Sequence, residues 1–247
     1  MTLLVTLIGK DGLVLAADSR GTFGDPRGVT AQNDTQQKAH ILSSHVAVLT
    51  AGVGPVGALI VDMTKKAVAE RKVDGATAVL NVLREVARSQ YNNWFPSVPP
   101  IQPAAAMAAG QVAVRPALSF LVAGYEEGGA PKTPRLYGLD SFSDFSPMLH
   151  DYGFAVQGIA QYALYLLNRL YESDRTIEEL IPLAVYVITE TASQDGKVGG
   201  PVNVITIEAG DRGCQRMTPD AVQKIQEANA SRSKVLRDSF YKKAGVA

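Results

Sequence analysis

Three side chains near the start of the chain have types suited to acyl-transfer chemistry: Thr2, Asp18 and Lys38. A threonine hydroxyl is a poor nucleophile unless a base lies beside it. An N-terminal residue carries its own base, because a free α-amino group has a pKa of about 7.7–8.0. Removal of Met1 would therefore give Thr2 a nucleophile and a base in one residue. The same residue is equally compatible with an ordinary strand start.

Asp18 and Lys38 are of types that could support such a nucleophile. Asp18 and Arg20 end an otherwise uncharged apolar run, which indicates a buried ion network or a plain salt bridge at a strand end. Lys38 precedes the apolar run AHIL. If it lay near Asp18 and the amine of Thr2, the neighbouring cation would lower the pKa of Lys38, and Lys38 could stabilise an alkoxide. It could equally be a surface lysine, and taken singly each residue favours the plain structural interpretation.

Other chemistries have little support in the sequence. The three histidines have no spacing typical of a metal site, and Cys214 is the only cysteine. No GxSxG motif and no glycine-rich nucleotide-binding motif follows a strand-like run. We therefore expect no metal and no cofactor.

The composition excludes several classes of protein. The 247 residues are 46% hydrophobic and 19% charged, which is typical of a globular chain. Lys+Arg and Asp+Glu are equal at 24 each, so neither nucleic acid nor an anionic membrane is an expected partner. No apolar run reaches the roughly 18 residues of a membrane span. A single cysteine suits the reducing cytoplasm.

The pattern of apolar residues predicts the elements that would hold these side chains. Runs of strands alternate with pairs of helices, which favours two packed sheets with helices outside, in a single domain over 1–247. A polar, glycine-containing stretch, 21–37, follows the first two strand-like runs. A Pro/Ala-rich insertion is expected at 93–116 and a charged C-terminal helix at about 218–244. The expected strands are 3–8, 13–17, 38–42, 46–52, 118–125, 135–140, 152–158 and 201–210, and the helices 54–73, 75–92, 161–171 and 176–194.

Several motifs in the same order and spacing resemble the proteasome β-type family of N-terminal nucleophile hydrolases. They are TLLVTLIGKDGLVLAADSRGT, then VAVLTAGVGPVGALI, and later YALYLLNRLYESDRTIEELIPLAVYVITETASQDGKVGGPVNVITI. The bacterial homologues of this family also begin almost directly at the threonine. The resemblance implies an α+β fold, a four-layer αββα sandwich of two antiparallel sheets between helix layers.

The resemblance also implies roles for single residues. Thr2 falls at the nucleophile, Asp18 at the carboxylate that orients the lysine, and Lys38 at the catalytic lysine. Gly52 falls at the glycine whose backbone N–H stabilises the tetrahedral oxyanion. Asp195 falls at a second supporting aspartate near the threonine amine.

Substrate-binding positions follow from the same resemblance. A substrate backbone would pair as an added strand with Thr22, Gly52 and Gly54. Two departures concern hydroxyls that the family places around the amine: Gly158 and Val198 stand where serines are usual. The positions implied to bind substrate are Gly21, Thr22, Gln36, His40, Thr50 and Gly54.

The expected function is therefore a cytoplasmic threonine-type peptidase or amidase acting on peptides or unfolded protein. A homo-oligomeric ring and an ATPase regulator are the partners that the resemblance implies. Two alternatives stay open. The same acyl-enzyme could pass its acyl group to an amine, as in a ligase, or the chain could be a catalytically weakened structural subunit.

Overall fold

In the computed structural model, which describes residues 2–25, 28–96, 115–126, 133–210 and 212–241, the apolar runs form strands buried on both faces. In β2 (Gly12–Ala17), Val14 and Ala16 belong to one apolar core, whereas Leu13 and Leu15 belong to another. Successive side chains of a strand point to opposite faces. A strand that packs on both faces therefore needs an almost unbroken apolar sequence.

Within the described residues, the main strands form two antiparallel five-stranded sheets. The order is β10-β1-β2-β11-β12 in the first sheet and β5-β6-β7-β8-β9 in the second. The strands of the first sheet are β1 (Leu3–Ile8), β2, β10 (Phe154–Gly158), β11 (Asn203–Glu208) and β12 (Cys214–Arg216). Those of the second are β5 (Ala39–Ser43), β6 (Val46–Gly52), β7 (Leu118–Tyr125), β8 (Pro134–Asp140) and β9 (Met148–Leu149).

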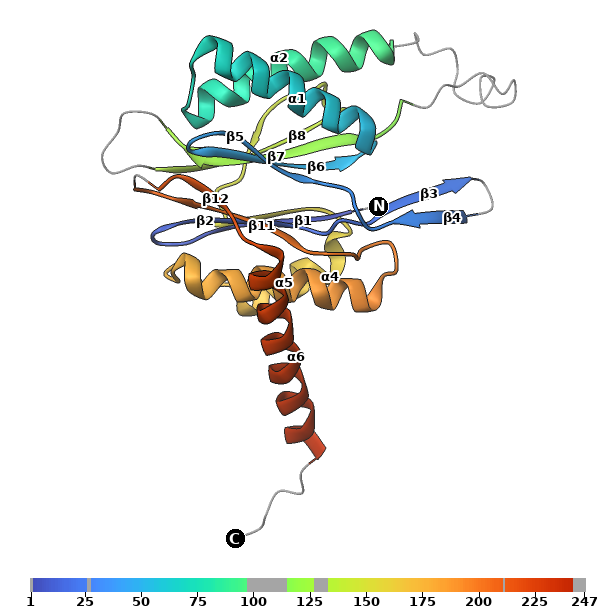
Figure 1. The fold of residues 1–247 in the computed structure, drawn as a ribbon, viewed down its shortest axis with the longest axis vertical. Coiled ribbons are helices and arrows are strands. Elements are labelled where there is room, and N and C mark those ends of the chain that lie inside the picture. Colours follow the sequence, from blue (N-terminus) through green and yellow to red (C-terminus); the bar gives the residue numbers. More distant parts are fainter. Residues whose placement is uncertain (1, 26–27, 97–114, 127–132, 211, 242–247) are drawn as a thin grey trace.

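Helices cover the outer face of each sheet (Figure 1). α1 (Gly54–Arg71) and α2 (Ala76–Trp94) lie on the second sheet, and α4 (Ala160–Leu170) and α5 (Ile177–Gln194) lie on the first. Three apolar cores separate the layers: one under each helix pair and one between the sheets. The predicted four-layer αββα sandwich is confirmed.

Local signals in the sequence explain two junctions of the sandwich. In the turn GKDG, Gly9 N donates to Gly12 O at 2.7 Å and joins β1 to β2 as a hairpin. At the start of α5, Thr176 and Glu179 form a capping box, because each side chain accepts from the other's backbone N–H.

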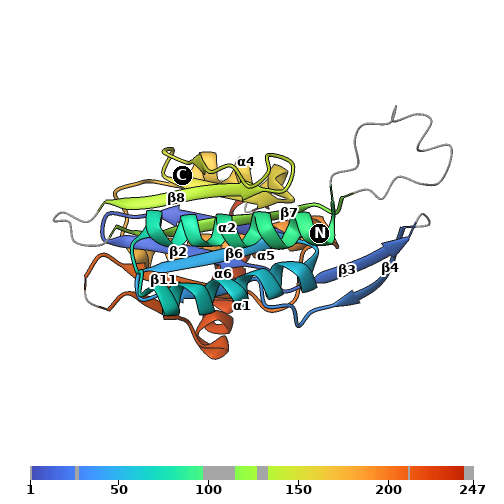
Figure 2. The same ribbon diagram turned by 90° about the horizontal axis from the view of Figure 1, so that it is seen from above.

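Residues 21–37, for which no strand was predicted, contain a pair of strands. β3 (Gly21–Asp25) and β4 (Gly28–Asn33) pair as a hairpin that extends sideways from the sandwich, next to the N-terminus (Figures 1 and 2). Phe23 on β3 is half exposed. Strands that are not buried need no run of apolar residues, so the sequence pattern did not indicate them. α2 runs to Trp94, which shortens the predicted insertion, and residues 97–114 lie outside the described residues.

α6 (Pro219–Tyr241) lies within the range predicted for the C-terminal helix, and residues 242–247 lie outside the described part. It leaves the sandwich and projects away from α5 (Figure 1). Near the middle of α6, the buried side chain of Asn229 donates through Nδ2 to Pro182 O at 2.9 Å and joins the helix to α5.

Candidate active site

Thr2 lies directly before β1 and is held from both sides. Ile159 N donates to Thr2 O at 2.8 Å, and the next residue, Leu3, donates its N–H to Asp18 Oδ1 at 2.9 Å. Thr2 is only 6% exposed. The residues that follow β2 and β10 therefore hold the backbone at Thr2 from both sides.

Asp18 is a buried hub just past the end of β2. Its Oδ1 accepts from Leu3 N and from Lys38 Nζ at 2.8 Å. Its Oδ2 accepts from Arg20 N and Gly199 N, both at 3.2 Å. A carboxylate with no exposed surface needs this many donors, because burial removes its water. The carboxylate thus ties four separate segments together around Thr2.

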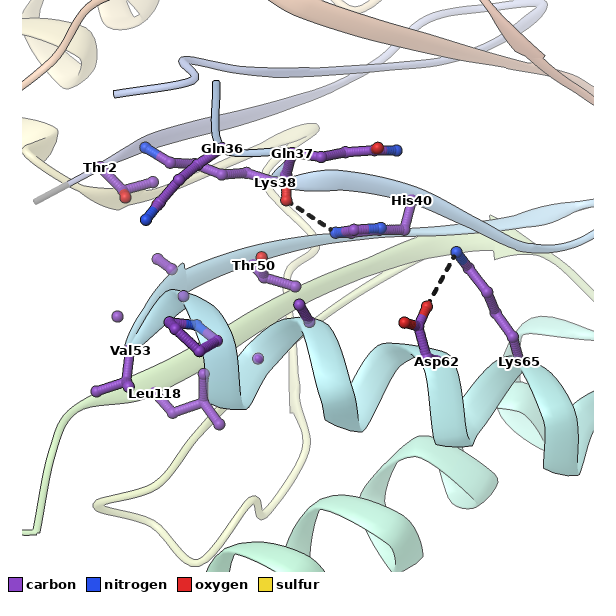
Figure 3. A pocket seen from close by; sticks show the side chains of 16 residues that line it. Thr2, Gln36, Gln37, Lys38, His40, Thr50, Val53, Asp62, Lys65 and Leu118 are labelled. Atoms are coloured by element: carbon purple, nitrogen blue, oxygen red, sulfur yellow. Dashed lines mark hydrogen bonds and ion pairs between the residues drawn. The ribbon is translucent and has the colours of Figure 1, made fainter. Parts of the chain in front are cut away.

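Lys38 brings a buried cation to the site. Its Nζ donates to Asp18 Oδ1 at 2.8 Å and to Arg20 O at 2.7 Å, and its side chain is 4% exposed. Burial lowers the pKa of Lys38, and the charge of Asp18 partly opposes that shift. Figure 3 shows Lys38 and Gln36 reaching toward Thr2 from the same segment.

Gly52 ends β6 in a backbone conformation suited to glycine. Its φ is +105°, and an added Cβ would lie 2.0 Å from Ala117 O. Thr50 N, two residues earlier, donates to Lys38 O at 2.8 Å. Backbone N–H groups alternate in direction along a strand, so Thr50 and Gly52 direct theirs to the same side of β6. The Gly52 N–H therefore points to the side on which Lys38 lies. α1 begins two residues later, with a proline in its first turn.

Two cavities adjoin Thr2. The first, of about 410 Å³, runs along α1 and is lined by Lys38, His40 and Thr50 on its other side (Figure 3). The second, of about 340 Å³, lies toward β3 and is lined by Gly21, Thr22 and Phe23. Residues that line both are Thr2, Gln36, Gly52, Val53, Gly54 and Pro55.

His40 contributes a neutral ring to the wall of the first cavity. Burial, together with the nearby charge of Lys65, lowers the pKa of His40 to about 4. A neutral imidazole donates from one nitrogen only, and Nε2 lies 3.1 Å from Gln37 O, so Nε2–H is the donor. The cavity wall is therefore polar but uncharged at this point near neutral pH.

The residues at the far end of the first cavity were not predicted from the sequence. Asp62 and Lys65 of α1 lie there as a loose pair, with Lys65 Nζ 3.7 Å from Asp62 Oδ1 (Figure 3). Gly54, Ala58 and Asp62 recur every four residues, so they share one face of the helix. That spacing was the signal that could have found them.

Asp195 lines neither cavity. Its Oδ1 accepts from Lys197 N at 2.9 Å, and the loop that it opens reaches the site through the bond from Gly199 N to Asp18. Arg20 joins this loop to the β3–β4 hairpin, because it pairs with Asp34 at 2.7 Å and donates to Gly196 O at 3.0 Å.

The two positions without a serine differ in their surroundings. Gly158 has φ +93°, and an added Cβ would lie 1.8 Å from Thr2 O. Val198 has no exposed surface and packs in the core beneath α5. At Gly158 the backbone itself therefore excludes a side chain, whereas at Val198 the side chain belongs to the core.

Other reactive groups have little role here. Burial raises the pKa of the Cys214 thiol to about 12, so the thiol stays protonated at neutral pH. Within the described residues, no three His, Cys, Asp or Glu side chains come together as a metal site requires. No helix in the described part of the chain is long and apolar enough to cross a bilayer.

Comparisons with known proteins agree with this architecture. No family model matches the chain. The Pyrococcus abyssi protein named "Proteasome subunit beta 2" is 29% identical over 218 residues, which cover 83% of this chain and 86% of that protein. "Proteasome subunit beta 2" of Pyrococcus furiosus is 27% identical over 217 residues, with the same two coverages.

Solved structures of other proteins share the fold over nearly all of the chain. "Anbu (ancestral beta-subunit)" from Yersinia bercovieri has a TM-score of 0.72 at 17% identity and covers 99% of both chains. An Anbu (Gly-1) mutant from Hyphomicrobium sp. strain MC1 has a TM-score of 0.69 at 18% identity and covers 100% of both.

Proposed function

Since this chain is related to proteasome β subunits and has the fold of the ancestral β-subunits, we propose that it is a threonine-type peptidase or amidase with Thr2 as its nucleophile. The observation that carries the proposal is the buried Asp18–Lys38 pair, 2.8 Å apart, beside Thr2 and the first cavity. A buried ion pair is costly unless well satisfied, so its position next to a nucleophile favours a chemical role.

The proposed reaction needs Met1 to be removed, so that Thr2 has a free α-amino group. The amine takes the proton of Thr2 Oγ as Oγ attacks a peptide carbonyl, and the Lys38 ammonium stabilises the developing alkoxide. The Gly52 N–H stabilises the oxyanion of the tetrahedral intermediate. Collapse of that intermediate breaks the C–N bond, and the leaving amine takes the proton. Water then hydrolyses the Thr2 ester, which releases the acid and restores Oγ–H.

Asp18 and Asp195 have supporting roles in this proposal. Asp18 orients Lys38 directly. Asp195 acts through its loop, whose Gly199 N–H reaches the Asp18 carboxylate. Thr22, Gly52 and Gly54 would receive the substrate backbone as an added strand, while His40 and Thr50 would contact a side chain in the first cavity.

The assembly is part of the same proposal. Relatives named as subunits favour a homo-oligomeric, ring-like particle in the cytoplasm, working on peptides or unfolded protein with an ATPase as regulator. Native mass spectrometry of the purified particle would give the copy number, and a monomer at micromolar concentration would contradict this part.

Intact-mass analysis and covalent labelling test the chemistry. We expect the mature chain to begin at Thr2 and to gain one adduct from a threonine-directed β-lactone. The Thr2→Ala variant should gain none. Retention of Met1, or equal labelling of both chains, would refute the mechanism. A competing amine added to the peptide assay separates hydrolysis from acyl transfer, because only a ligase yields the amide product.

One observation favours the alternative of a weakened subunit. The backbone at Gly158 has no room for a side chain, and Val198 is committed to the core. Two hydroxyls that would bond around the threonine amine are therefore missing. Labelling of Thr2 without peptide turnover would favour this alternative over the peptidase.

A further inference from the structure

The side chain of Gln36 lies at the boundary between the two cavities. It lines both, together with Thr2 and the turn from Gly52 to Pro55. Figure 3 shows it extended from the segment before β5 toward Thr2 and the start of α1. The residue is half-buried, so its position depends on the walls around it.

Two glycines make room for the Gln36 amide. A Cβ added to Gly21 would lie 2.4 Å from Gln36 Nε2, closer than real Cβ contacts allow. A Cβ added to Gly54 would lie 3.0 Å from the same nitrogen. The amide therefore fills the space between the start of β3 and the start of α1, two walls that come from distant parts of the sequence.

An extended substrate would need that same space. A chain that adds as a strand between Thr22 and Gly54 has to pass from the second cavity to the first across the surface of Thr2. The amide of Gln36 closes this passage in the observed rotamer. The two cavities remain separately accessible, so a small acyl group can reach Thr2 without passing Gln36.

We propose that Gln36 is a specificity-determining crossbar: in its observed rotamer the site accepts small acyl groups, and it accepts an extended peptide only after the amide swings out from between Gly21 and Gly54. This inference deepens the proposed function and rests on it for the identity of the substrate. Glutamine has flexible side-chain torsions, so the swing needs no backbone movement.

The crossbar predicts opposite effects on large and small ligands. If the open rotamer is a minor state of about 10%, the apparent Kd of a peptide is about tenfold higher than that of a permanently open site. Gln36→Ala removes the crossbar and should tighten peptide binding by about that factor. Gln36→Met keeps the length of the side chain and should keep the weak binding, because the barrier is steric.

Peptide binding can be measured without relying on catalysis. In a Thr2→Ala background, fluorescence anisotropy gives the Kd of a fluorescein-labelled unstructured octapeptide. Gln36→Ala should lower this Kd about tenfold, whereas Gln215→Ala, the same truncation on β12, should leave it unchanged. An unchanged or weaker Kd in Gln36→Ala, including no detectable binding to either chain, would overturn the crossbar.

A second measurement separates the crossbar from the proposed chemistry. In chains that keep Thr2, the labelling rate by a small β-lactone should change far less with Gln36→Ala than the peptide Kd does. A parallel rise in both would mean general loosening of the site and would overturn the crossbar. Absence of lactone labelling in every chain would refute the nucleophile, while the Kd comparison would still decide the role of Gln36.

Discussion

Replacing Lys38 by methionine tests whether the buried ion pair is as the structure describes it. The side chains of Lys38 and Asp18 are 4% and 0% exposed, and their charged atoms lie 2.8 Å apart. Removing one partner of such a pair leaves an uncompensated charge and costs about 3–5 kcal/mol of unfolding free energy. Asp18 keeps three backbone donors in the variant, which favours the lower end.

The expected loss for Lys38→Met is therefore about 3 kcal/mol. In a chain of 247 residues this corresponds to a fall in Tm of roughly 6–12 °C, taking about 2–4 °C per kcal/mol. Urea unfolding followed by circular dichroism at pH 7 gives the free energy, and a thermal scan gives Tm.

Lys65→Met is the matched control. The Lys65 side chain is 39% exposed and its Nζ is 3.7 Å from Asp62 Oδ1. An exposed pair of this kind contributes less than about 1 kcal/mol. If Lys38→Met destabilises the chain no more than Lys65→Met does, the Lys38–Asp18 pair is not a buried charge pair and the reasoning about the site fails.

Three further substitutions test other parts of the structure. His40 has a pKa of about 4 in the fold, against about 6.5 in the unfolded chain. Below pH 6.5 the unfolded chain binds a proton that the fold does not, so the unfolding free energy decreases as pH falls from 6.5 toward 4. This decrease is on the order of 3 kcal/mol. Urea unfolding at pH 6.5 and at pH 4 should show it in the unchanged chain, and the His40→Gln variant should lack it. Gly158→Ala should cost about 2 kcal/mol or more, because its Cβ meets Thr2 O, whereas Gly196→Ala has open space and should be near neutral; equal melting temperatures would contradict this. Thr176→Ala should cost about 1 kcal/mol through the lost capping box, and no change in urea midpoint would argue against that cap.

The elements that were predictable from sequence are those whose signals are local. The GKDG turn and the Thr176–Glu179 box each lie within four residues, and both form as their residue types favour. The sandwich follows from unbroken apolar runs that need cover on both faces. The β3–β4 hairpin was missed because its strands leave the sandwich, so burial imposes no alternation on them.

The site divides in the same way. The resemblance points to Asp18 and Lys38, and the structure brings their charged atoms together. The position of the Gln36 amide depends on the approach of Gly21 to Gly54, which only the tertiary fold decides. The expected place of Asp195 near the threonine amine stays a prediction; its Oδ1 accepts from Lys197 N in its own loop.

The four donors of Asp18 determine when the site can assemble during synthesis of the chain. Three of them, from Leu3, Arg20 and Lys38, leave the ribosome early, but the fourth is the N–H of Gly199. A nascent chain that has not reached this residue therefore holds an under-satisfied carboxylate at its centre. An activity that depends on this carboxylate would arise only after Gly199 has been synthesised. Under the proposed function, this connectivity would keep the growing chain inactive while its own unfolded segments are the nearest substrate.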